Sequence, residues 1–345
     1  MSVQEIVENL PDMEANFGGL IKNVSDDHEG GNLSPMPDNH SDAFLEETDR
    51  PLPEVINQNT RYLFLHNIGS GGKSVINACK DRHLNRVVAY KSLRPEFVDD
   101  EVENIRLLRE ARVSAMFQHP NTIPIYEAGR DNHGHYYFTM KLVRGYTLRK
   151  ILGYREHYDL SQLMEVFEQV SHGLARAHDL HVAHRDIKPE NILVGCYGEV
   201  LLMDWGLAKV WGKNGGILEE PLGLDLVAES DRSMTGHGKV QGTLCYMSPE
   251  QLHRDPDITI STDIYSLGSV LYELLTGQTP FESDKTYELL DMLEHKVPAK
   301  PSSISEYPVP KVLEELCMNC LEKDPANRPN SISEVMRAVE HWSHP

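Results

Sequence analysis

The segment His184–Asn191, with the sequence HRDIKPEN, and the downstream string DWG combine side chains that are rarely found together by chance. Phosphoryl transfer needs a carboxylate near the attacking hydroxyl, oxygen ligands for Mg²⁺ and a cation near the moving phosphate. Asp186 offers the carboxylate and Lys188 the cation, while Asn191 and Asp204 offer the oxygens. A single Asp or Asn in a loop is most often a turn former, but the whole ordered string predicts phosphoryl-transfer chemistry.

A glycine-rich segment lies upstream, between two strand-like runs. It reads IGSGGKSVI from Ile68 to Ile76, and its glycines allow backbone amides to approach phosphates closely. On its own, such a run is more often a plain hairpin turn. In the next strand-like run, the period of two puts Val87, Ala89 and Lys91 on one face. Ala89 can therefore lie against a flat base while Lys91 reaches its phosphates.

Residues 100–117 have the periodicity of a helix inserted among these strand-like runs. Leu107, Glu110 and Ser114 share one face of this helix at i, i+3 and i+7, so the acid can turn toward the sheet. For another acid of the helix, Glu103, a surface position is expected.

The chain from Arg61 onward divides into two regions that differ in the periodicity of their apolar residues. From Arg61 onward, short β-like runs surround the single helix and predict a small sheet. After Gly145 the apolar residues recur every three or four positions, which predicts helices at 160–180, 261–276, 283–295, 309–322 and 331–342.

Composition narrows the class of protein. The 345 residues carry a formal net charge of −20, which offers no electrostatic footprint for nucleic acid and disfavours anionic membranes. The N-terminus has no signal-peptide or lipid-anchor pattern, and no run of about eighteen apolar residues occurs that would predict a membrane segment. Five scattered cysteines argue against a disulfide framework, so we expect a cytoplasmic protein.

Residues 1–58 differ from the rest in composition. Residues 1–60 hold 13 acidic residues but only two basic ones, mixed with Gly, Asn, Pro and Ser. Their apolar content is too low to offset the entropy of ordering, so a mobile tail is expected. The tail either solubilises the protein or competes for a basic pocket and thereby inhibits.

Together these strings resemble the protein-kinase signature over about residues 61–342. More narrowly, IGSGGKS, HPNTIPIYEAG, HRDIKPENILVG, GEVLLMDWGLAK and GTLCYMSPEQL are similar to bacterial eukaryotic-like (Hanks-type) serine/threonine protein kinases. The resemblance implies an α+β, two-lobed protein-kinase fold, with a small antiparallel-sheet N-lobe that has one main helix and a larger helical C-lobe. The implied division is an acidic tail at 1–58, the N-lobe and hinge at 59–143, and the C-lobe at 144–345, with an activation segment at 204–250 and an acidic insertion in it at about 213–231.

The resemblance also implies a role for each motif position. The implied catalytic residues are Asp186, Lys188, Lys91, Glu110 and Thr243, with Glu110 as the partner of Lys91. Met140 stands at the gatekeeper position and Lys141 to Val143 at the hinge. The implied ATP-binding residues are Ile68, Gly69, Ser70, Gly71, Gly72, Ile76, Ala89, Lys91, Met140, Lys141, Val143, Asn191 and Asp204. Mg²⁺, or Mn²⁺ in its place, would be held by Asn191 and Asp204.

Several positions depart from the family pattern. Ser74 stands in place of the third glycine of the loop, Ser114 in place of a frequent Leu, and Lys141 in place of a frequent Glu. Trp205 replaces the usual Phe of the DFG string, and Ser248 the usual Ala of APE. Because Trp is larger than Phe, the balance between active and inactive positions of this segment is expected to differ from the common pattern.

Two structural roles follow from the same resemblance. Glu250 is expected to pair with Arg328, and Asp263 to hold the backbone of the catalytic loop.

Three basic residues indicate how the protein could be regulated. By family geometry, Arg185, Lys209 and Arg106 lie near one pocket, and a phosphate on the activation segment would satisfy these three cations. We hypothesise autophosphorylation at Thr235, with Ser233 as the second choice. The alternative is that both hydroxyls are merely loop residues.

These observations predict a kinase that transfers the γ-phosphate of Mg-ATP to Ser and Thr hydroxyls of proteins, including itself, through transient self-association. Lys188 and Thr243 favour a serine/threonine kinase, and with the SPE string they favour protein substrates over small molecules. The alternative is a weak or inactive pseudokinase that acts as a nucleotide-binding signalling module. Only Ser74 and Trp205 favour this alternative. No nucleic-acid partner is expected.

Overall fold

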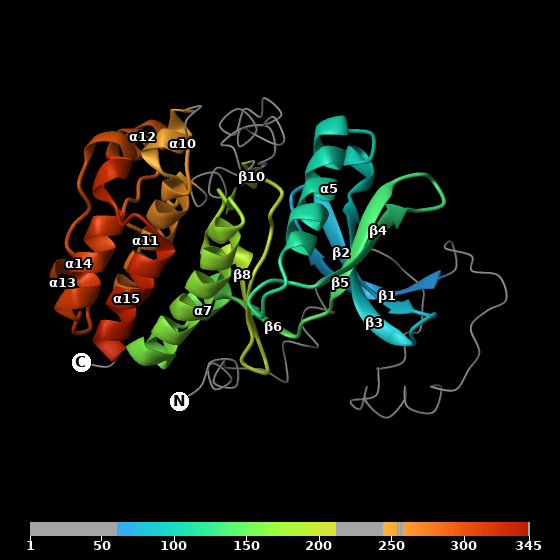
Figure 1. Cartoon of the computed structure of the whole chain (residues 1–345), viewed down its shortest axis with the longest axis horizontal. Coiled ribbons are helices and arrows are strands. Elements are labelled where there is room, and N and C mark those ends of the chain that lie inside the picture. The colour runs from blue at the N-terminus through green and yellow to red at the C-terminus, as the bar shows by residue number, and fades with distance from the viewer. Residues whose placement is uncertain (1–60, 212–243, 254, 256–257, 344–345) are drawn as a thin grey trace. The chain divides into compact units, whose positions relative to one another are not determined.

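The computed structural model describes residues 61–211, 244–253, 255 and 258–343 (Figure 1). These residues form two compact units. The sheet unit holds residues 61–108 and 125–142, and the helical unit holds residues 109–124 and 143–343 apart from the gaps given above. Several predicted features lie outside the described residues, namely the tail at 1–58, the insertion at 213–231, Thr235, Ser233 and Thr243.

The sheet unit is a five-stranded antiparallel sheet in the order β1-β2-β3-β5-β4. Its strands occupy the β-like runs of the sequence: β1 (Tyr62–Ser70), β2 (Ser74–Asp81), β3 (Arg86–Leu93), β4 (Ile125–Arg130) and β5 (Tyr136–Lys141). Ala78, Ala89 and Met140 lie in register on three neighbouring strands, and all three are buried. A short 3-10 helix, η1 (Pro95–Phe97), follows β3.

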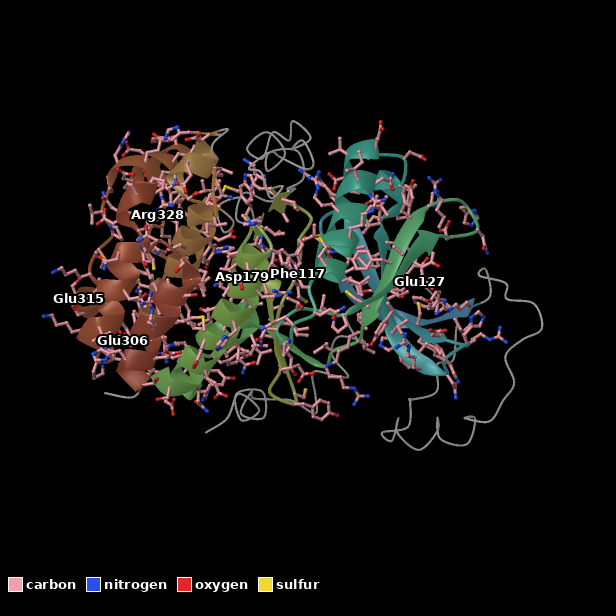
Figure 2. All side chains as sticks on the ribbon, viewed as in Figure 1. Phe117, Glu127, Asp179, Glu306, Glu315 and Arg328 are labelled. Carbon is pink, nitrogen blue, oxygen red and sulfur yellow. The ribbon has the colours of Figure 1, made fainter. Side chains whose placement is uncertain are left out.

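Outside the core of this sheet, polar residues fix the strands by ion pairs. Glu127 of β4, labelled in Figure 2, accepts a hydrogen bond from the hydroxyl of Tyr137 (2.9 Å) and pairs with Arg61. Arg61 also pairs with the buried carboxylate of Asp81 at 3.0 Å. These contacts join Arg61, which directly precedes β1, to β2 and β4 and join β4 to β5, so the start of the described chain is tied to the sheet.

Helix α5 (Glu101–Met116) lies within one residue of the predicted bounds at each end. It begins there because the carboxylate of Asp100 accepts hydrogen bonds from the backbone N–H groups of Val102 (2.9 Å) and Glu103 (3.2 Å). Leu107, Glu110 and Ser114 are all buried, which confirms the predicted face. Residues 101–108 of α5 belong to the sheet unit and 109–116 to the helical unit.

The helical unit contains a longer series of elements (Figure 1). Its helices are α6 (Leu148–Leu152), α7 (Leu160–Asp179), α10 (Pro249–Leu252), α11 (Ser261–Thr276), α12 (Thr286–His295), α13 (Pro301–Ile304), α14 (Lys311–Cys320) and α15 (Ile332–Ser343). Its short 3-10 helices are η2 (Arg155–His157), η3 (Pro189–Asn191) and η4 (Pro325–Asn327). Strands β6 (Gly145–Thr147), β8 (Ile192–Gly195) and β9 (Val200–Leu202) form one small sheet, and β7 (Val182–Ala183) pairs with β10 (Lys209–Val210).

Helix α7 shows how local sequence fixes an element. Asp159 and Gln162 form a capping box, in which each side chain accepts a hydrogen bond from the other's backbone N–H (2.9 and 3.0 Å). The apolar residues that recur every three or four positions along this helix are all buried, namely Leu163, Val166, Val170, Leu174 and Ala177. Helix α12 starts three residues later than predicted, because the hydroxyl of Ser283 accepts from the N–H of Lys285 and forms a turn instead.

The expected fold class, a small antiparallel sheet with one main helix followed by a larger helical part, is therefore confirmed. No helix in the described parts of the chain combines the length and the apolar character needed to cross a bilayer.

Candidate active site

The segment His184–Asn191 runs from the end of β7 to the start of β8 in the helical unit. It closes with the turn η3, in which the N–H of Asn191 donates to the carbonyl of Lys188 (2.9 Å). Arg185 adopts a φ of 69°, a left-handed conformation that is unfavourable for a residue with a side chain. Bonds from elsewhere in the fold must therefore hold this loop in place.

Asp263 of α11 provides these bonds. Its carboxylate is fully buried and accepts hydrogen bonds from the backbone N–H groups of His184 and Arg185, each at 2.8 Å. It also contacts Nε2 of His178 at 2.8 Å. Burial alone would raise the pKa of Asp263, but the hydrogen bond from His178 and the neighbouring donors outweigh it and hold this pKa below its usual value. The predicted anchoring role of Asp263 is confirmed.

Asp186 lies at the centre of a polar cluster. The ammonium of Lys188 donates to both carboxylate oxygens of Asp186 at 2.8 Å. The amide nitrogen of Asn191 donates to the backbone carbonyl of Asp186 (2.8 Å) and to its Oδ2 (2.9 Å). The structure thus brings these three predicted residues together, with the Asp186 side chain only 12 % exposed.

The charges of this cluster act on each other. Burial raises the pKa of Asp186, and the negative charge of Asp204 adds to the rise, while Lys188 opposes it. Burial would lower the pKa of Lys188, but attraction to Asp186 outweighs this and raises the pKa, so Lys188 stays an ammonium. A carboxylate that is poised in this way can accept the hydrogen bond of an incoming hydroxyl.

His184 connects the loop to the DWG string. Its Nδ1 lies 3.2 Å from the backbone N–H of Asp186 and accepts from it, so the proton sits on Nε2, which donates to the carbonyl of Met203 (2.9 Å). The ring of Trp205 packs on His184 (centroids 4.4 Å apart) and on Phe117 (4.5 Å), which is labelled in Figure 2. His184 therefore has a packing and positioning role.

Trp205 occupies the site of the usual Phe without any exposed surface. Its indole N–H is buried and has no hydrogen-bond partner among the described residues. A buried donor without a partner costs about 1 to 3 kcal/mol. This donor is a feature of the indole ring that a Phe would not bring, in addition to the larger size.

A backbone hydrogen bond brings the two predicted metal ligands, Asn191 and Asp204, near each other. The N–H of Met203 donates to the carbonyl of Asn191 (2.9 Å), so Asp204 follows directly after a residue that is tied to the catalytic loop. Asp204 has a φ of 65°, another left-handed residue at this place. Because the amide nitrogen of Asn191 donates to Asp186, the other atom of that amide is a carbonyl oxygen. An amide oxygen and a carboxylate are donors that suit Mg²⁺.

The sheet unit carries the other predicted residues. The glycine-rich turn between β1 and β2 is closed by a bond from the N–H of Gly71 to the carbonyl of Ser74 (2.8 Å). Across β2, β3 and β5, Lys91 pairs with Ile76 on one side and with Phe138 on the other. Ala89 pairs with Met140 one step along the sheet. The sheet thus aligns the residues that were predicted to hold a base and its phosphates.

Glu103 does not lie on the surface as expected. Its side chain is 7 % exposed, and its Oε1 pairs with Lys73 of the glycine-rich turn (2.7 Å) and with Arg106 (2.8 Å). The surface expectation was wrong because a carboxylate between two cations gains enough to offset its desolvation. The contact ties the glycine-rich turn to α5 within the sheet unit.

We predict that Glu103→Gln raises the KM for ATP several-fold, with a smaller effect on kcat, because Lys73 and the turn lose their anchor. The unfolding free energy is expected to fall by about 1 to 3 kcal/mol, because Lys73 and Arg106 both lose the carboxylate with which they pair. Steady-state kinetics and urea unfolding measure both. Glu101→Gln, at an exposed position of the same helix, is the matched control, and equal KM values for the two variants would contradict the prediction.

The predicted site residues divide between the units. Ile68, Gly69, Ser70, Gly71, Gly72, Ile76, Ala89, Lys91, Met140 and Lys141 belong to the sheet unit, and Glu110, Val143, Asp186, Lys188, Asn191 and Asp204 to the helical unit. Lys91 and Glu110 are both buried, and they belong to different units. Their predicted pairing stays a prediction.

Arg109, which was not among the cations predicted to bind a phosphate, lies near Arg185 in the helical unit. Arg106 pairs with Glu103 in the sheet unit, whereas Arg109 lies close enough to Arg185 to lower its pKa, after burial, which is the larger cause. The Nε of Arg185 is buried without a hydrogen-bond partner among the described residues. The spacing along α5 contains no signal for this contact, because Arg109 and the buried Glu110 are adjacent in sequence and adjacent helix residues do not share a face.

Glu250 and Arg328 pair as predicted. The guanidinium of Arg328, labelled in Figure 2, donates to both oxygens of Glu250 at 2.6 and 2.9 Å and is fully buried. This pair fastens α10, which begins at the end of the predicted activation segment, to the turn before α15.

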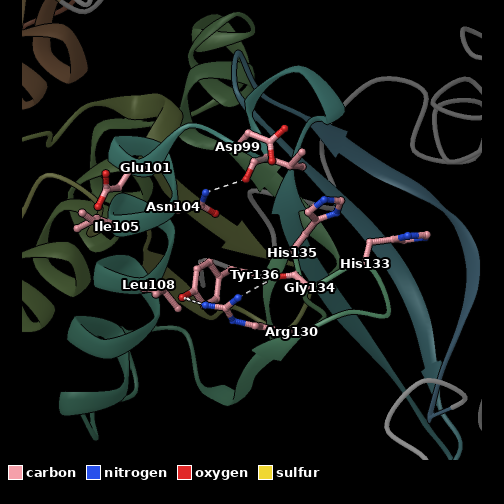
Figure 3. A pocket seen from close by; sticks show the side chains of 11 residues that line it. Asp99, Glu101, Asn104, Ile105, Leu108, Arg130, His133, Gly134, His135 and Tyr136 are labelled. Carbon is pink, nitrogen blue, oxygen red and sulfur yellow. Dashed lines mark hydrogen bonds between the residues drawn. The ribbon is translucent and has the colours of Figure 1, made fainter.

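A separate pocket lies in the sheet unit, between the N-terminal half of α5 and the turn that joins β4 to β5 (Figure 3). Its lining mixes acidic, basic and apolar side chains, including Asp99, Glu101, Ile105, Arg130 and His135. None of the predicted site residues lines it. No group of three or more His, Cys, Asp or Glu side chains with the arrangement of a metal site occurs in the described residues.

Comparison with known proteins agrees with this geometry. Residues 62–342 match the family described as protein kinase domain. The chain is 35 % identical over 316 residues to serine/threonine-protein kinase PknD of Protochlamydia amoebophila, covering 86 % of this chain and 31 % of that protein. It is 33 % identical over 281 residues to the probable serine/threonine-protein kinase PknB of Lactococcus lactis, covering 81 % and 41 %. It is also 33 % identical over 269 residues to PrkC of Bacillus subtilis, covering 78 % and 38 %. The chain thus spans about a third of the length of these relatives.

Proposed function

Because the chain belongs to the protein kinase family and is similar to bacterial serine/threonine kinases, we propose that it transfers the γ-phosphate of Mg-ATP to Ser and Thr hydroxyls of proteins. The observation that carries the proposal is the cluster of Asp186, Lys188 and Asn191 on a loop that Asp263 fastens. A fold kept only for binding has no need of this arrangement.

Within the proposed reaction, Asp186 accepts the hydrogen bond of the substrate hydroxyl and orients its oxygen toward the phosphate. The ammonium of Lys188 is held at 2.8 Å from Asp186, so it lies beside the reacting hydroxyl. From there it balances the negative charge that develops on the transferred phosphoryl group. Asn191 and Asp204 would hold Mg²⁺ or Mn²⁺, which when bound neutralises charge on the phosphates. The helical unit thus supplies both the acceptor of the hydroxyl's hydrogen bond and the metal ligands.

The sheet unit is proposed to bind the nucleotide. Ala89 and Met140, adjacent in register, would contact the base, and Lys141 and Val143 would offer backbone groups at the hinge. Lys91 would pair with phosphate oxygens and with Glu110. The glycine-rich turn from Gly69 to Ser74 would present backbone N–H groups to the phosphates. Thr243 is proposed as a further catalytic residue by resemblance alone.

Autophosphorylation is proposed as the form of regulation. Thr235, or Ser233 as the second choice, would carry the phosphate, which would be bound by Arg185 and Arg109. The buried Nε of Arg185, which has no partner among the described residues, supports an anionic ligand at this place. Transient self-association of two copies would allow one chain to modify the other.

The proposed location is the cytoplasm, where ATP is available and thiols stay reduced. All five cysteines are free thiols, which is compatible with this environment.

Asp186→Asn tests the proposed function. The wild-type protein with Mg-ATP is expected to gain phosphate on Ser or Thr and to phosphorylate a basic protein substrate, whereas the variant is expected to lose this activity by at least about 10³-fold. Because the pKa of Asp186 is raised, the wild-type rate should fall on the acid side at a higher pH than for an ordinary Asp. Intact mass, phosphosite mapping and a pH profile measure these results.

Each alternative has its own outcome in the same experiment. Retained ATP binding in a thermal-shift assay without any phosphate transfer by the wild type would favour the pseudokinase. Transfer to a small hydroxyl compound but to no protein would favour a small-molecule kinase. Full autophosphorylation of Thr235→Ala with an unchanged phosphate count would exclude Thr235 as the site.

A further inference from the structure

Four side chains of the helical unit form a network at the edge of the catalytic loop. Nε of Arg149, from α6, donates to Glu190 of the loop at 2.7 Å. The two terminal nitrogens of Arg149 bind Glu273 of α11 and the hydroxyl of Tyr246, and that hydroxyl donates to the same carboxylate. One guanidinium therefore joins two glutamates that are distant in sequence.

The network runs from the interior to the solvent. The side chain of Glu273 is 6 % exposed, that of Arg149 37 % and that of Glu190 43 %. Burial raises the pKa of Tyr246, and the charge of Glu273 raises it further, so Tyr246 remains a neutral donor. The inner end is thus a buried carboxylate with its donors, and the outer end is an ion pair open to water.

The open end belongs to the loop that, under the proposed function, receives the substrate hydroxyl. Glu190 belongs to the same loop as Asp186, four residues further along the chain, and Lys188 between them contacts the Asp186 carboxylate. Tyr246 follows the position of Thr243 by three residues. A peptide that presents its hydroxyl to Asp186 continues on either side of it, so we expect one of its flanking residues to lie beside this network.

We propose that Arg149 determines the peptide specificity of this kinase by occupying, between Glu190 and Glu273, the place that an arginine of the substrate would otherwise take. This inference rests on the proposed function. The wild-type protein accordingly does not select peptides with basic residues beside the acceptor.

The chemistry of the site supports this assignment. A guanidinium carries five N–H donors in a planar fork, and here two carboxylates and a hydroxyl accept from three of its nitrogens. Without Arg149, two glutamates converge with no cation between them, one of them buried. A substrate arginine can restore these charge-assisted bonds, whereas a lysine ammonium, a single point charge, restores fewer of them.

Arg149→Ala tests the inference with a set of peptides. Each peptide keeps one Ser or Thr acceptor and carries Arg, Lys, Ala or Glu at one neighbouring position, and kcat/KM is measured for every pair of enzyme and peptide. For the wild type we expect Arg and Ala peptides to differ by less than about threefold. For Arg149→Ala we expect a preference for Arg over Ala of about tenfold or more at one position, with a smaller preference for Lys.

Two further variants separate specificity from stability. Arg149→Gln keeps a hydrogen-bond donor for Glu273 and should show the same shift if Arg149→Ala does not fold. The double variant Arg149→Ala with Glu273→Gln removes the buried charge, and its preference for Arg should fall back toward the wild-type ratio. Arg337→Ala, which removes an exposed arginine of α15, is the matched control and should keep the wild-type ratio.

The outcomes that overturn the inference are distinct from those that overturn the function. A wild type that already prefers Arg peptides tenfold, or folded Arg149 variants that keep the wild-type ratio, would overturn the specificity assignment while leaving the kinase activity intact. A wild type that phosphorylates no peptide and no protein would overturn the proposed function and this inference with it.

Discussion

Replacing Asp263 by Ala is expected to abolish phosphate transfer and to lower the unfolding free energy by about 3 to 5 kcal/mol. The carboxylate is completely buried and accepts from the backbone of His184 and Arg185 and from the ring of His178. Its loss leaves these donors without a partner and releases Arg185 from its left-handed conformation. Asp186 is the next residue, and a displacement of about 1 Å at a catalytic group can cost about 10²-fold in rate.

The measurement for Asp263 is urea unfolding together with the rate of autophosphorylation. Asp179→Ala is the matched control, because Asp179 is an exposed acid at the end of α7 (Figure 2) and its loss should change neither quantity. Asp263→Asn keeps the size of the side chain but not its charge, so a smaller loss of stability is expected. If Asp263→Ala unfolded at the same urea concentration as Asp179→Ala, the anchoring role would be refuted.

Asp263 also predicts a pH dependence. Because its pKa is lower in the folded state than the value of about 3.9 in the unfolded chain, its contribution to stability is fully present above that value. The contribution is lost as the pH falls through the folded-state pKa. The difference in stability between the wild type and Asp263→Asn should therefore shrink in strongly acidic buffer, which urea unfolding at several pH values would detect.

Arg328→Met is expected to destabilise the protein by about 3 to 5 kcal/mol, because it leaves the buried carboxylate of Glu250 without its cation. The guanidinium also donates to the backbone carbonyls of Glu322 (2.7 Å), Ser261 (2.9 Å) and Lys323 (3.0 Å). The two bonds to Glu250 are buried, the three to backbone carbonyls are partly buried, and the Arg328 side chain has no exposed surface. The loss exceeds that expected for an exposed ion pair, which contributes about 0 to 1 kcal/mol.

A double-mutant cycle isolates the pair. Glu250→Gln with Arg328→Met should be less destabilised than the sum of the two single changes, by about 1 to 3 kcal/mol, because neither charge is then buried alone. Arg337→Ala serves again as the control for the loss of an arginine. Strict additivity of the two single changes in urea unfolding would show that the pair contributes nothing as a pair.

The sequence by itself determined the chemistry and the main elements. The ordered string from His184 to Asn191 leaves few alternative interpretations, because its residue types and their spacing match those that phosphoryl transfer needs. Helices α5, α7 and α11 were predicted within one residue at each end, since their apolar periodicity and caps are local properties. The roles of Asp263 and Glu250 came from the family pattern, and the contacts of the helical unit confirm them.

Only the tertiary structure decided the partners of charged residues. Glu103 was expected on the surface because a helix pattern shows only neighbours within one or two turns, whereas its partner Lys73 lies 30 positions earlier. The position of Arg109 beside Arg185 was not predicted, for the same reason.

The network of Arg149 shows this limit most clearly. Arg149 and Glu273 are 124 positions apart, and nothing in either segment indicates that the two side chains meet. Periodicity and motif spacing report local conformation and the chemistry of one loop. Which charge neutralises which, and therefore what a substrate is able to bind, depends on how α6, α11 and the catalytic loop are folded against one another.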